Sequence, residues 1–341
     1  MDRIRIGLVG VGWVAQVIHL PLLTKFPDVE VAAVCDRDKA KARLVAEKFG
    51  ITRIYTDLAV MLREENLAAV VICSSTDAHR TLACTAIEAG VDVLIEKPIA
   101  RHSHEAAAIA DVAKAHKQVV MVGMNHRFRP DIMILKSFLE GKELGKIIYA
   151  RTGWLRKSPR DASWYLNADK SGGGVFVDLG IVMLDLALWL MGYPEVERVG
   201  AHLYHSQTKG VEDTALTTLT LANGSSIIIE VSWSMTVEDD VYYGFFFGSG
   251  GTASIQPLRI IKSLHGNLVN MAPAKVENRQ ASFRKSYENE LHHFLGAVRR
   301  EHEVISTVDE ALQRMRIVDA VYRSARLGKE ISLTDARGKV L

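Results

Sequence analysis

The chain has 341 residues, of which 48% are hydrophobic and 24% are charged, and its formal net charge is +2. This is the composition of an ordinary globular protein, and the length exceeds what a single hydrophobic core usually fills, so we expect two domains. The small net charge, without any block rich in lysine and arginine, argues against nucleic-acid and membrane partners.

Cysteine usage and hydropathy bear on the compartment. The three cysteines, Cys35, Cys73 and Cys84, lie in or beside apolar segments without C-x-x-C spacing. We therefore expect reduced thiols, with neither a disulfide framework nor a metal site. The chain enters a strand-like segment without a leader pattern, and no apolar stretch is expected to be long enough to span a bilayer. These features predict a cytoplasmic protein.

The first third of the chain alternates short β-branched segments with helical segments. This pattern is typical of βαβ units that build a parallel sheet. Gly50 and Gly90 close two of the predicted helices in the position that favours a left-handed residue. The predicted strands cover residues 4–9, 29–35, 69–73, 91–95 and 118–123, and the predicted helices include 39–49 and 77–89.

After about residue 124 the pattern changes to one of mixed helices and antiparallel strands. A turn at Asn223 and Gly224 joins two predicted strands into a hairpin. We therefore predict a doubly wound α/β Rossmann domain over residues 1–123 and an α+β domain over residues 124–341. In the second domain we expect strands over 213–221 and 225–233, and helices over 132–139, 286–300 and 308–327.

A glycine-rich turn follows the first predicted strand. Gly10, Gly12 and Ala15 stand where a dinucleotide-binding fingerprint has two glycines and a small residue, with a helical pattern starting near Trp13. Gly10 permits the tight turn, and Gly12 lets the backbone approach a pyrophosphate at the helix N-terminus. A strand before the turn and a helix after it favour a dinucleotide site over a turn without function.

Asp36 ends the second predicted strand, about twenty residues beyond the fingerprint, where an acid binds the adenosine ribose. Its carboxylate would repel a 2′-phosphate, so we expect NAD rather than NADP. Arg37, next to it, leaves NADP open, because a guanidinium could pair with that phosphate, stack on adenine or simply face solvent.

Lys97 follows the predicted strand over 91–95, between Glu96 and Pro98. Ligands of parallel α/β sheets bind at the carboxyl ends of the strands, so the position suggests a functional lysine. A cis Lys97–Pro98 bond would direct the side chain away from the strand end. A solvated lysine at a strand end is the alternative.

Several spaced motifs together resemble the glucose-fructose oxidoreductase, inositol dehydrogenase and MocA (Gfo/Idh/MocA) family over nearly the full length. They are Gly10-Val11-Gly12, Cys35-Asp36-Arg37, His79 with Ala89-Gly90-Val91, Glu96-Lys97-Pro98-Ile99-Ala100, residues 125–130, Ser171-Gly172-Gly173-Gly174, Asp178 with Asp185, and residues 319–324.

The resemblance implies a Rossmann domain followed by an open, mostly antiparallel sheet, hydride transfer with nicotinamide, and a sugar or polyol substrate. It also implies a homodimer or homotetramer formed through that sheet. The cofactor-binding residues are then expected to be Gly10, Gly12, Trp13, Val14, Asp36, Arg37, Ser74, Ser75, His79, Glu96, Lys97 and Asn125.

The family pattern after the triple glycine has a histidine that serves with the lysine in proton transfer, and Val182 stands in its place. Asp178, Val182 and Asp185 have the spacing of one helix face, so valine is expected where an imidazole would act. Valine cannot carry a proton. Lys97 is then the expected acid/base and Asp178 its partner, while Tyr165 and His126 are further candidate proton donors.

Aromatic and cationic residues suggest a substrate pocket. Aromatic faces stack on sugar rings, and arginines bind carboxylate or phosphate, which hints at an anionic sugar. Packing and surface ion pairs are the alternatives for these side chains. The expected substrate-binding residues are Lys97, His126, Arg127, Trp154, Arg156, Trp164, Tyr165, Asp178 and Val182, and Arg129 lies in the same segment as His126 and Arg127.

Three functions remain open from the sequence. The first is an NAD-dependent dehydrogenase or reductase of a sugar, polyol or sugar acid. The second is an NAD-dependent, redox-neutral glycoside hydrolase. The third is a binding protein that senses NADH or a sugar, in which Val182 marks lost catalysis. Each retains the dinucleotide fingerprint, so the fingerprint alone does not separate them.

Overall fold

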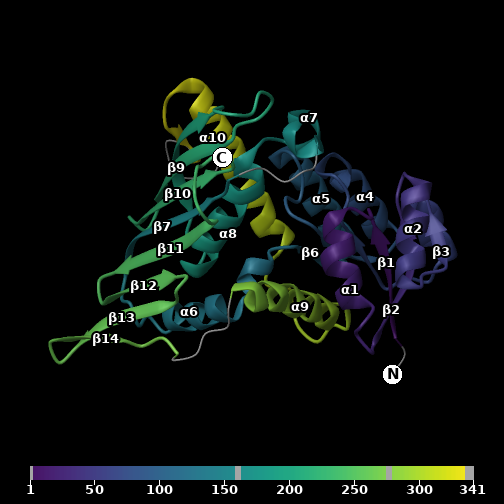
Figure 1. Ribbon diagram of the computed structural model, residues 1–341, viewed down its shortest axis with the longest axis horizontal. Coiled ribbons are helices and arrows are strands. Elements are labelled where there is room, and N and C mark those ends of the chain that lie inside the picture. Colours follow the sequence, from purple (N-terminus) through teal and green to yellow (C-terminus); the bar gives the residue numbers. More distant parts are fainter. Residues whose placement is uncertain (1–2, 158–162, 274–278, 335–341) are drawn as a thin grey trace. The chain divides into compact units, whose positions relative to one another are not determined.

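The computed structural model describes residues 3–157, 163–273 and 279–334 (Figure 1). Its contacts divide the chain into two compact units. The first unit comprises Met1–Asn125 and Ser286–Gln313, and the second comprises His126–Lys285 and Arg314–Leu341. The main division lies close to the boundary expected at residues 123 and 124, but the chain returns to the first unit near its end.

The first unit is built on a parallel sheet of six described strands in the order β3-β2-β1-β4-β5-β6. Strands β4 and β5 are buried along their whole length, as expected of strands covered by helices on both faces. This confirms the predicted Rossmann architecture. The strands are β1 Ile4–Val9, β2 Val29–Cys35, β3 Arg53–Tyr55, β4 Ala69–Ile72, β5 Asp92–Ile95 and β6 Val120–Val122.

The helices of this unit follow local signals in the sequence. Asp38 caps α2 by accepting a hydrogen bond from the Lys41 N–H, and Gly50 ends α2 in the left-handed region, as predicted. The short β3 and the helices α3 and α5 were not predicted. The described helices are η1 Ala15–His19, α1 Leu20–Leu23, α2 Lys39–Phe49, α3 Leu58–Glu64, α4 Thr76–Glu88 and α5 Ser103–His116, while α9 Arg279–Val298 and α10 Val308–Leu327 cross the division between units.

The second unit is built on a sheet of nine described strands in the order β14-β13-β12-β11-β7-β10-β9-β8-β15. All neighbours pair antiparallel except β7 and β10, which confirms the mostly antiparallel sheet. The strands are β7 Ile147–Leu155, β8 Val196–Tyr204, β9 Thr214–Leu221, β10 Ser226–Ser232, β11 Val241–Gly248, β12 Gly251–Ile255, β13 Arg259–Leu264, β14 Asn267–Asn270 and β15 Ile331–Ser332.

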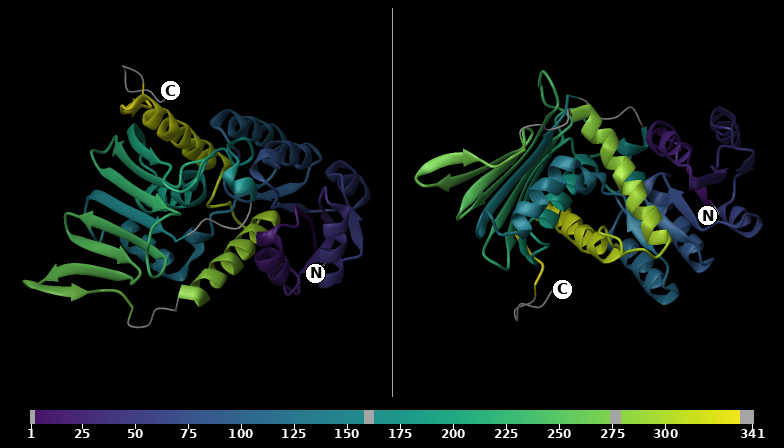
Figure 2. Two further views of the ribbon diagram at one scale, coloured as in Figure 1. Left: turned by 45° about the horizontal axis from the view of Figure 1, so that its top comes forward. Right: turned by 90° about the horizontal axis from the view of Figure 1, so that it is seen from below.

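Helices of the second unit cover one face of this sheet, and Figure 2 shows the other face without helices of the same unit. Helix α8 Ile181–Leu190 packs on β7 and β10, and α6 Pro130–Glu140 packs on β12. The remaining described helices of this unit are η2 Asn125–Phe128 at its start, η3 Ser163–Leu166, α7 Ala168–Ser171 and η4 Phe176–Gly180.

One expectation about membrane spans was wrong. Ala168–Leu190 is a 23-residue helical stretch that is long and apolar enough to cross a bilayer, with a mean hydropathy of 1.9. All of its apolar window is buried inside the protein, and α8 lies against the sheet. Length and composition alone do not distinguish a membrane span from the core helix of a two-layer domain, which is what the structure shows here.

A buried ion cluster joins α8 to the rest of the second unit. Asp185 of α8 accepts two hydrogen bonds from Arg127, at 2.9 and 2.6 Å, and a third from Arg314 at 2.6 Å. Tyr193 donates to the same carboxylate at 3.3 Å. Burial alone would raise the pKa of Asp185, but the two guanidinium groups hold it below its ordinary value. The ionised carboxylate is thus satisfied by two opposite charges and one neutral hydroxyl donor from three chain segments.

We predict that Asp185→Asn lowers the free energy of unfolding at pH 7 by about 3–5 kcal/mol, because two buried cations lose their counter-charge. The native pKa of Asp185 lies below the ordinary value of 3.8. The contribution of this carboxylate is therefore complete above that value and is lost as the pH falls through the native pKa.

Urea unfolding followed by circular dichroism at pH 7 and pH 3 measures this effect. The difference between the wild type and Asp185→Asn should narrow at pH 3, whereas the exposed control Asp239→Asn should match the wild type at both. A difference of equal size at both pH values would contradict the assignment.

Candidate functional site

The turn after β1 has the geometry that a dinucleotide fingerprint requires. Gly10 has a φ of +84°, and a Cβ there would lie 2.6 Å from the backbone nitrogen of Ser74. Glycine is therefore needed both for the turn and for the close approach of the loop after β4. At Gly12 the nearest atom to an added Cβ is 3.8 Å away. Gly12 thus leaves room on its outer side for a ligand, and Trp13, which follows it, is exposed.

Asp36 directly follows β2 and is hydrogen-bonded to the glycine turn. Its Oδ2 accepts the Val11 N–H at 2.8 Å, and its Oδ1 accepts the Asp38 N–H at 3.0 Å. Lys41 Nζ lies 3.9 Å from Oδ2. Each carboxylate oxygen has a second lone pair, so this arrangement holds Asp36 in place and leaves it able to accept ribose hydroxyls. Arg37 is exposed.

His79 is an internal support between two loops. Its Nδ1 lies 2.8 Å from the Pro98 carbonyl oxygen, and its Nε2 lies 3.1 Å from the Ser74 carbonyl oxygen. The side chain is only 1% exposed, and burial lowers the pKa of His79 below its ordinary value. The protein itself occupies both ring nitrogens. The ring ties Ser74 in the loop after β4 to Pro98 in the loop after β5, and the contact of His79 with the cofactor stays a prediction.

Glu96 is the first residue after β5 and is almost completely buried. Its Oε1 lies 2.8 Å from His19 Nε2, and its Oε2 accepts the N–H of Lys97 at 3.2 Å. Burial alone would raise the pKa of Glu96, but the hydrogen bond and charge of His19, together with Lys97, hold it below its ordinary value. The Lys97–Pro98 bond is cis, as expected. The carboxylate therefore turns back onto the chain instead of facing a ligand, and sequence reasoning missed His19.

Asn125 ends the first part of the first unit. Its amide donates to the Ser286 hydroxyl at 2.9 Å, and Ser286 begins the segment that returns to this unit. The Val122 N–H likewise donates to the Ser306 carbonyl oxygen at 3.0 Å. The returning segment thereby closes the edge of the sheet beside β6.

In the second unit, His126, Trp154 and Tyr242 form an aromatic group. The His126 ring centroid lies 5.4 Å from that of Trp154 and 5.3 Å from that of Tyr242. His126 Nδ1 also lies 2.9 Å from the Tyr242 hydroxyl. Two of the expected substrate-binding residues are therefore neighbours, and Tyr242 is a third member that the sequence did not single out. The Trp154 indole N–H is buried and has no partner among the described residues.

The other predicted substrate residues lie in different settings. Arg127 is fully buried in the Asp185 cluster, so the structure argues against the expected substrate-binding role for it. Arg129 is held in the same way by Asp131 at 2.6 Å. Arg156 is partly exposed and pairs with Asp240 at 3.3 Å.

Two aromatic residues and the glycine-rich segment lie close together along the chain. In η3 the rings of Trp164 and Tyr165 stack with centroids 3.8 Å apart. Asp178 of η4 and Val182 of α8 are both buried, and valine stands in the first turn of α8. Trp164 and Tyr165 are partly exposed, whereas Asp178 and Val182 are not.

The glycine-rich segment before η4 is held by a residue that sequence reasoning missed, Glu212. Glu212 accepts the N–H groups of Gly174 and Phe176, each at 2.9 Å, and the Tyr322 hydroxyl at 2.7 Å. A Cβ on Gly174 would lie 2.0 Å from the Glu212 carbonyl oxygen. A carboxylate at the N-terminus of a helix is favourable, so Glu212 fixes the start of the helical segment that carries Asp178.

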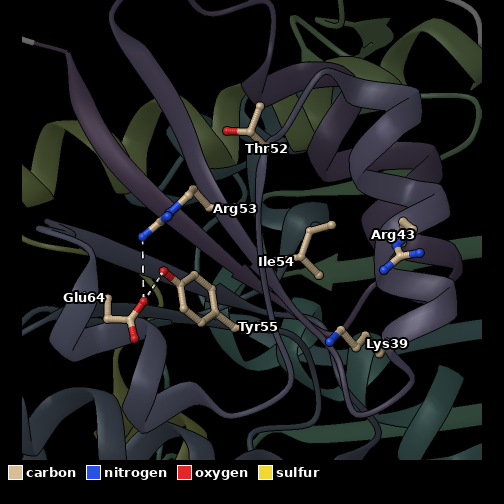
Figure 3. A pocket seen from close by; sticks show the side chains of 7 residues that line it. All are labelled: Lys39, Arg43, Thr52, Arg53, Ile54, Tyr55 and Glu64. Carbon is tan, nitrogen blue, oxygen red and sulfur yellow. Dashed lines mark hydrogen bonds and ion pairs between the residues drawn. The ribbon is translucent and has the colours of Figure 1, made fainter.

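A separate hollow of about 300 Å³ lies between α2 and β3 (Figure 3). Its cations are Lys39, Arg43 and Arg53, and Arg53 is paired with Glu64 at 3.6 Å. None of the predicted site residues lines it.

Comparison with known proteins agrees with this arrangement. The family model "Oxidoreductase family, NAD-binding Rossmann fold" matches residues 4–124, and "Oxidoreductase family, C-terminal alpha/beta domain" matches residues 136–333. D-glucoside 3-dehydrogenase of Escherichia coli K12 is 27% identical over 97% of each chain. The scyllo-inositol 2-dehydrogenase (NAD(+)) of Bacillus subtilis 168 is 27% identical over 97% of this chain and 96% of its own.

Among solved structures, levoglucosan dehydrogenase in complex with NADH and L-sorbose matches with a TM-score of 0.88. It is 21% identical and covers 97% of this chain and 99% of its own, which shows a common fold. The two family models together cover most of the chain. The chain therefore belongs to the Gfo/Idh/MocA oxidoreductase family, and its first unit is an NAD-binding Rossmann domain.

Proposed function

We propose that the protein is an NAD-dependent dehydrogenase or reductase that transfers hydride between nicotinamide and a sugar, polyol or sugar acid, with Lys97 as the acid/base. One observation supports this most directly. Lys97 is the second residue after β5, at the same edge of the parallel sheet as the glycine turn after β1 and Asp36 after β2. Cofactors of such sheets bind along this edge. Lys97 therefore lies on the edge where a cofactor of this fold binds.

The chemistry requires a proton carrier as well as a hydride acceptor. Bound NAD supplies the acceptor for the hydride that leaves the carbon of a secondary alcohol. Lys97, as a neutral amine, takes the proton from the hydroxyl group while the carbonyl bond forms, and returns it in the reverse reaction. Asp178 is proposed to orient or relay for Lys97, and Tyr165 is a second candidate donor. Val182 contributes no proton, so Lys97 carries the greater share.

The substrate class is proposed from the relatives and the aromatic residues. The relatives' names describe dehydrogenation of a glucoside, of an inositol and of levoglucosan. In this chain the Trp164–Tyr165 stack is partly exposed and supplies faces on which a sugar ring can lie. Trp154 is the partly exposed member of the group that it forms with the buried His126 and Tyr242. Arg156 is a candidate to bind an acidic substituent of the substrate. The cytoplasmic location stays a prediction from the sequence.

We predict that Lys97→Met lowers kcat by about 100- to 10,000-fold, the usual contribution of general acid–base catalysis. The dissociation constant for NADH, measured by fluorescence titration, should stay within about threefold of the wild type, because the glycine turn and Asp36 are unchanged. Lys114→Met, an exposed substitution on α5, is the matched control. Full activity in Lys97→Met would remove Lys97 from the proposed role.

We also propose that a second copy of this chain covers the open face of the β7–β14 sheet. Aromatic rings gather there: Tyr149 and Phe247 stack with centroids 4.4 Å apart, and Phe245 is 41% exposed beside them. Arg151 of β7 and Glu230 of β10 pair at 3.2 Å on the same face. Exposed aromatic and arginine side chains of this kind are enriched at protein interfaces.

We predict that Phe245→Glu converts the assembly to a smaller species, because a carboxylate would be buried in the apolar contact. Light scattering coupled to size exclusion measures the mass. The wild type should elute as a dimer or tetramer and Leu44→Glu, a control on exposed α2, should match it. A wild-type monomer at micromolar concentration would refute the proposed interface.

A further inference from the structure

We propose that His19 is a positioning residue for Lys97, acting through the carboxylate of Glu96; this inference rests on the proposed function. His19 is the last residue of η1 and is fully buried. Its Nε2 lies 2.8 Å from Glu96 Oε1. The other oxygen of the same carboxylate accepts the N–H of Lys97 at 3.2 Å. A continuous path therefore runs from the imidazole through one carboxylate to the backbone of the lysine.

The backbone around His19 explains how the imidazole reaches Glu96. Residues Ala15–His19 form a π-helical turn, in which the Leu20 N–H donates to the Ala15 carbonyl oxygen. A π-turn inserts one extra residue into a helix, shifts the direction of the side chains after it, and occurs frequently at functional sites. The turn begins directly after the glycine loop, since the Gln16 N–H donates to the Gly12 carbonyl oxygen at 3.1 Å.

The same short helical segment therefore has two ends with different partners. Its first residues follow Gly12, where the N–H groups of the helix N-terminus are available for a pyrophosphate. Its last residue holds Glu96, 77 positions further along the chain. The segment thus joins the cofactor loop to the backbone of Lys97 within the first unit.

The surroundings of Glu96 show why the carboxylate needs His19. Glu96 is 9% exposed, so an oxygen without a donor would carry a desolvation penalty. Tyr287 of α9 meets the His19 ring edge-on at 6.0 Å. Without the imidazole donor, the carboxylate would turn toward another partner and release the Lys97 N–H.

A histidine that served only as core packing would not need to hydrogen-bond the carboxylate that accepts the Lys97 N–H. Burial raises the pKa of Cys73 well above its ordinary value, and the negative charges of Glu96 and Glu290 raise it further. Two carboxylates therefore lie near this thiol in the first unit. In such an acidic interior the imidazole of His19 gives Glu96 a hydrogen-bond donor, which an apolar side chain of similar size would not supply.

The test separates the donor from the shape of the ring. His19→Gln keeps a side-chain N–H for Glu96, whereas His19→Leu removes it. His116→Leu, at an exposed position of α5, is the matched control. The first readout needs no substrate: the rate at which acetic anhydride modifies Lys97, measured by mass spectrometry on the folded full-length protein. The second is the NADH dissociation constant, and the third is kcat against KM on any substrate found.

We expect His19→Leu to change the Lys97 modification rate by about fivefold, the effect of losing one hydrogen bond. Its kcat should fall about 10- to 100-fold, because a small displacement of an acid/base group is costly, while the KM for NAD stays within about twofold. His19→Gln and His116→Leu should remain within about twofold of the wild type in every readout.

Equal losses in His19→Gln and His19→Leu would overturn the proposal, since the ring alone would then matter. An unchanged Lys97 modification rate in His19→Leu would overturn it too. If His19→Leu does not fold, Glu96→Ala serves in its place. The modification rate of Lys97 is then expected to change in Glu96→Ala, and an unchanged rate would count against the proposal. If Lys97→Met keeps full turnover while His19→Leu changes the modification rate of Lys97, the proposed acid/base role is refuted and the positioning of Lys97 by His19 is supported.

Discussion

The parallel sheet of the first unit imposes the constraint on which the site depends: its described strands all end at one edge. Gly10 follows β1, Asp36 follows β2, Ser74 lies in the loop after β4, and Glu96 follows β5. Each loop holds its neighbour. Gly10 has no space for a side chain because the Ser74 backbone lies against it, Asp36 binds the Val11 N–H, and His79 joins Ser74 to Pro98. A ligand at this edge meets a surface that is already in place, which reduces the ordering cost of binding.

The second unit achieves rigidity through buried charge. Asp185 accepts hydrogen bonds from Arg127 and Arg314. Glu212 accepts hydrogen bonds from the start of η4 and from Tyr322. Removing one partner of the buried Asp185 ion pairs would be costly. Removing Glu212 would leave the buried N–H groups of Gly174 and Phe176 without their acceptor. Both carboxylates act on the long apolar helical stretch that carries Asp178 and Val182. The side chains proposed for chemistry therefore stand on a helix whose start and middle are both held by acids.

Local sequence patterns were sufficient to predict much of the first unit. Strands β1 and β2 and helix α2 end where periodicity and Gly50 predicted. The glycine turn and the acid after β2 were recognised from their spacing to the predicted strands, and a cis Lys97–Pro98 bond was raised as a possibility that the structure bears out. These features follow from short-range backbone constraints that the sequence states directly.

Long-range partners were not foreseeable in the same way. His19 and Glu96 are 77 positions apart, and Glu212 meets Tyr322 across 110 positions. An arginine in a substrate pocket and an arginine in a buried ion pair look alike in the sequence, so the pairing of Arg127 with Asp185 was not foreseen. The return of Ser286–Gln313 to the first unit was missed for the same reason, since helix periodicity does not reveal which core a helix joins.

The most direct test of the account is the NADH absorbance band recorded while purified protein is offered NAD or NADP with polyols, sugars, uronic acids and nucleotide sugars. The account predicts that the band grows with NAD and one class of carbohydrate. No growth with any of them, while NADH fluorescence still shows binding, would contradict the dehydrogenase. It would favour either a redox-neutral glycoside hydrolase, detectable by NAD-dependent release of p-nitrophenol from a synthetic glycoside, or a protein that only senses its ligands.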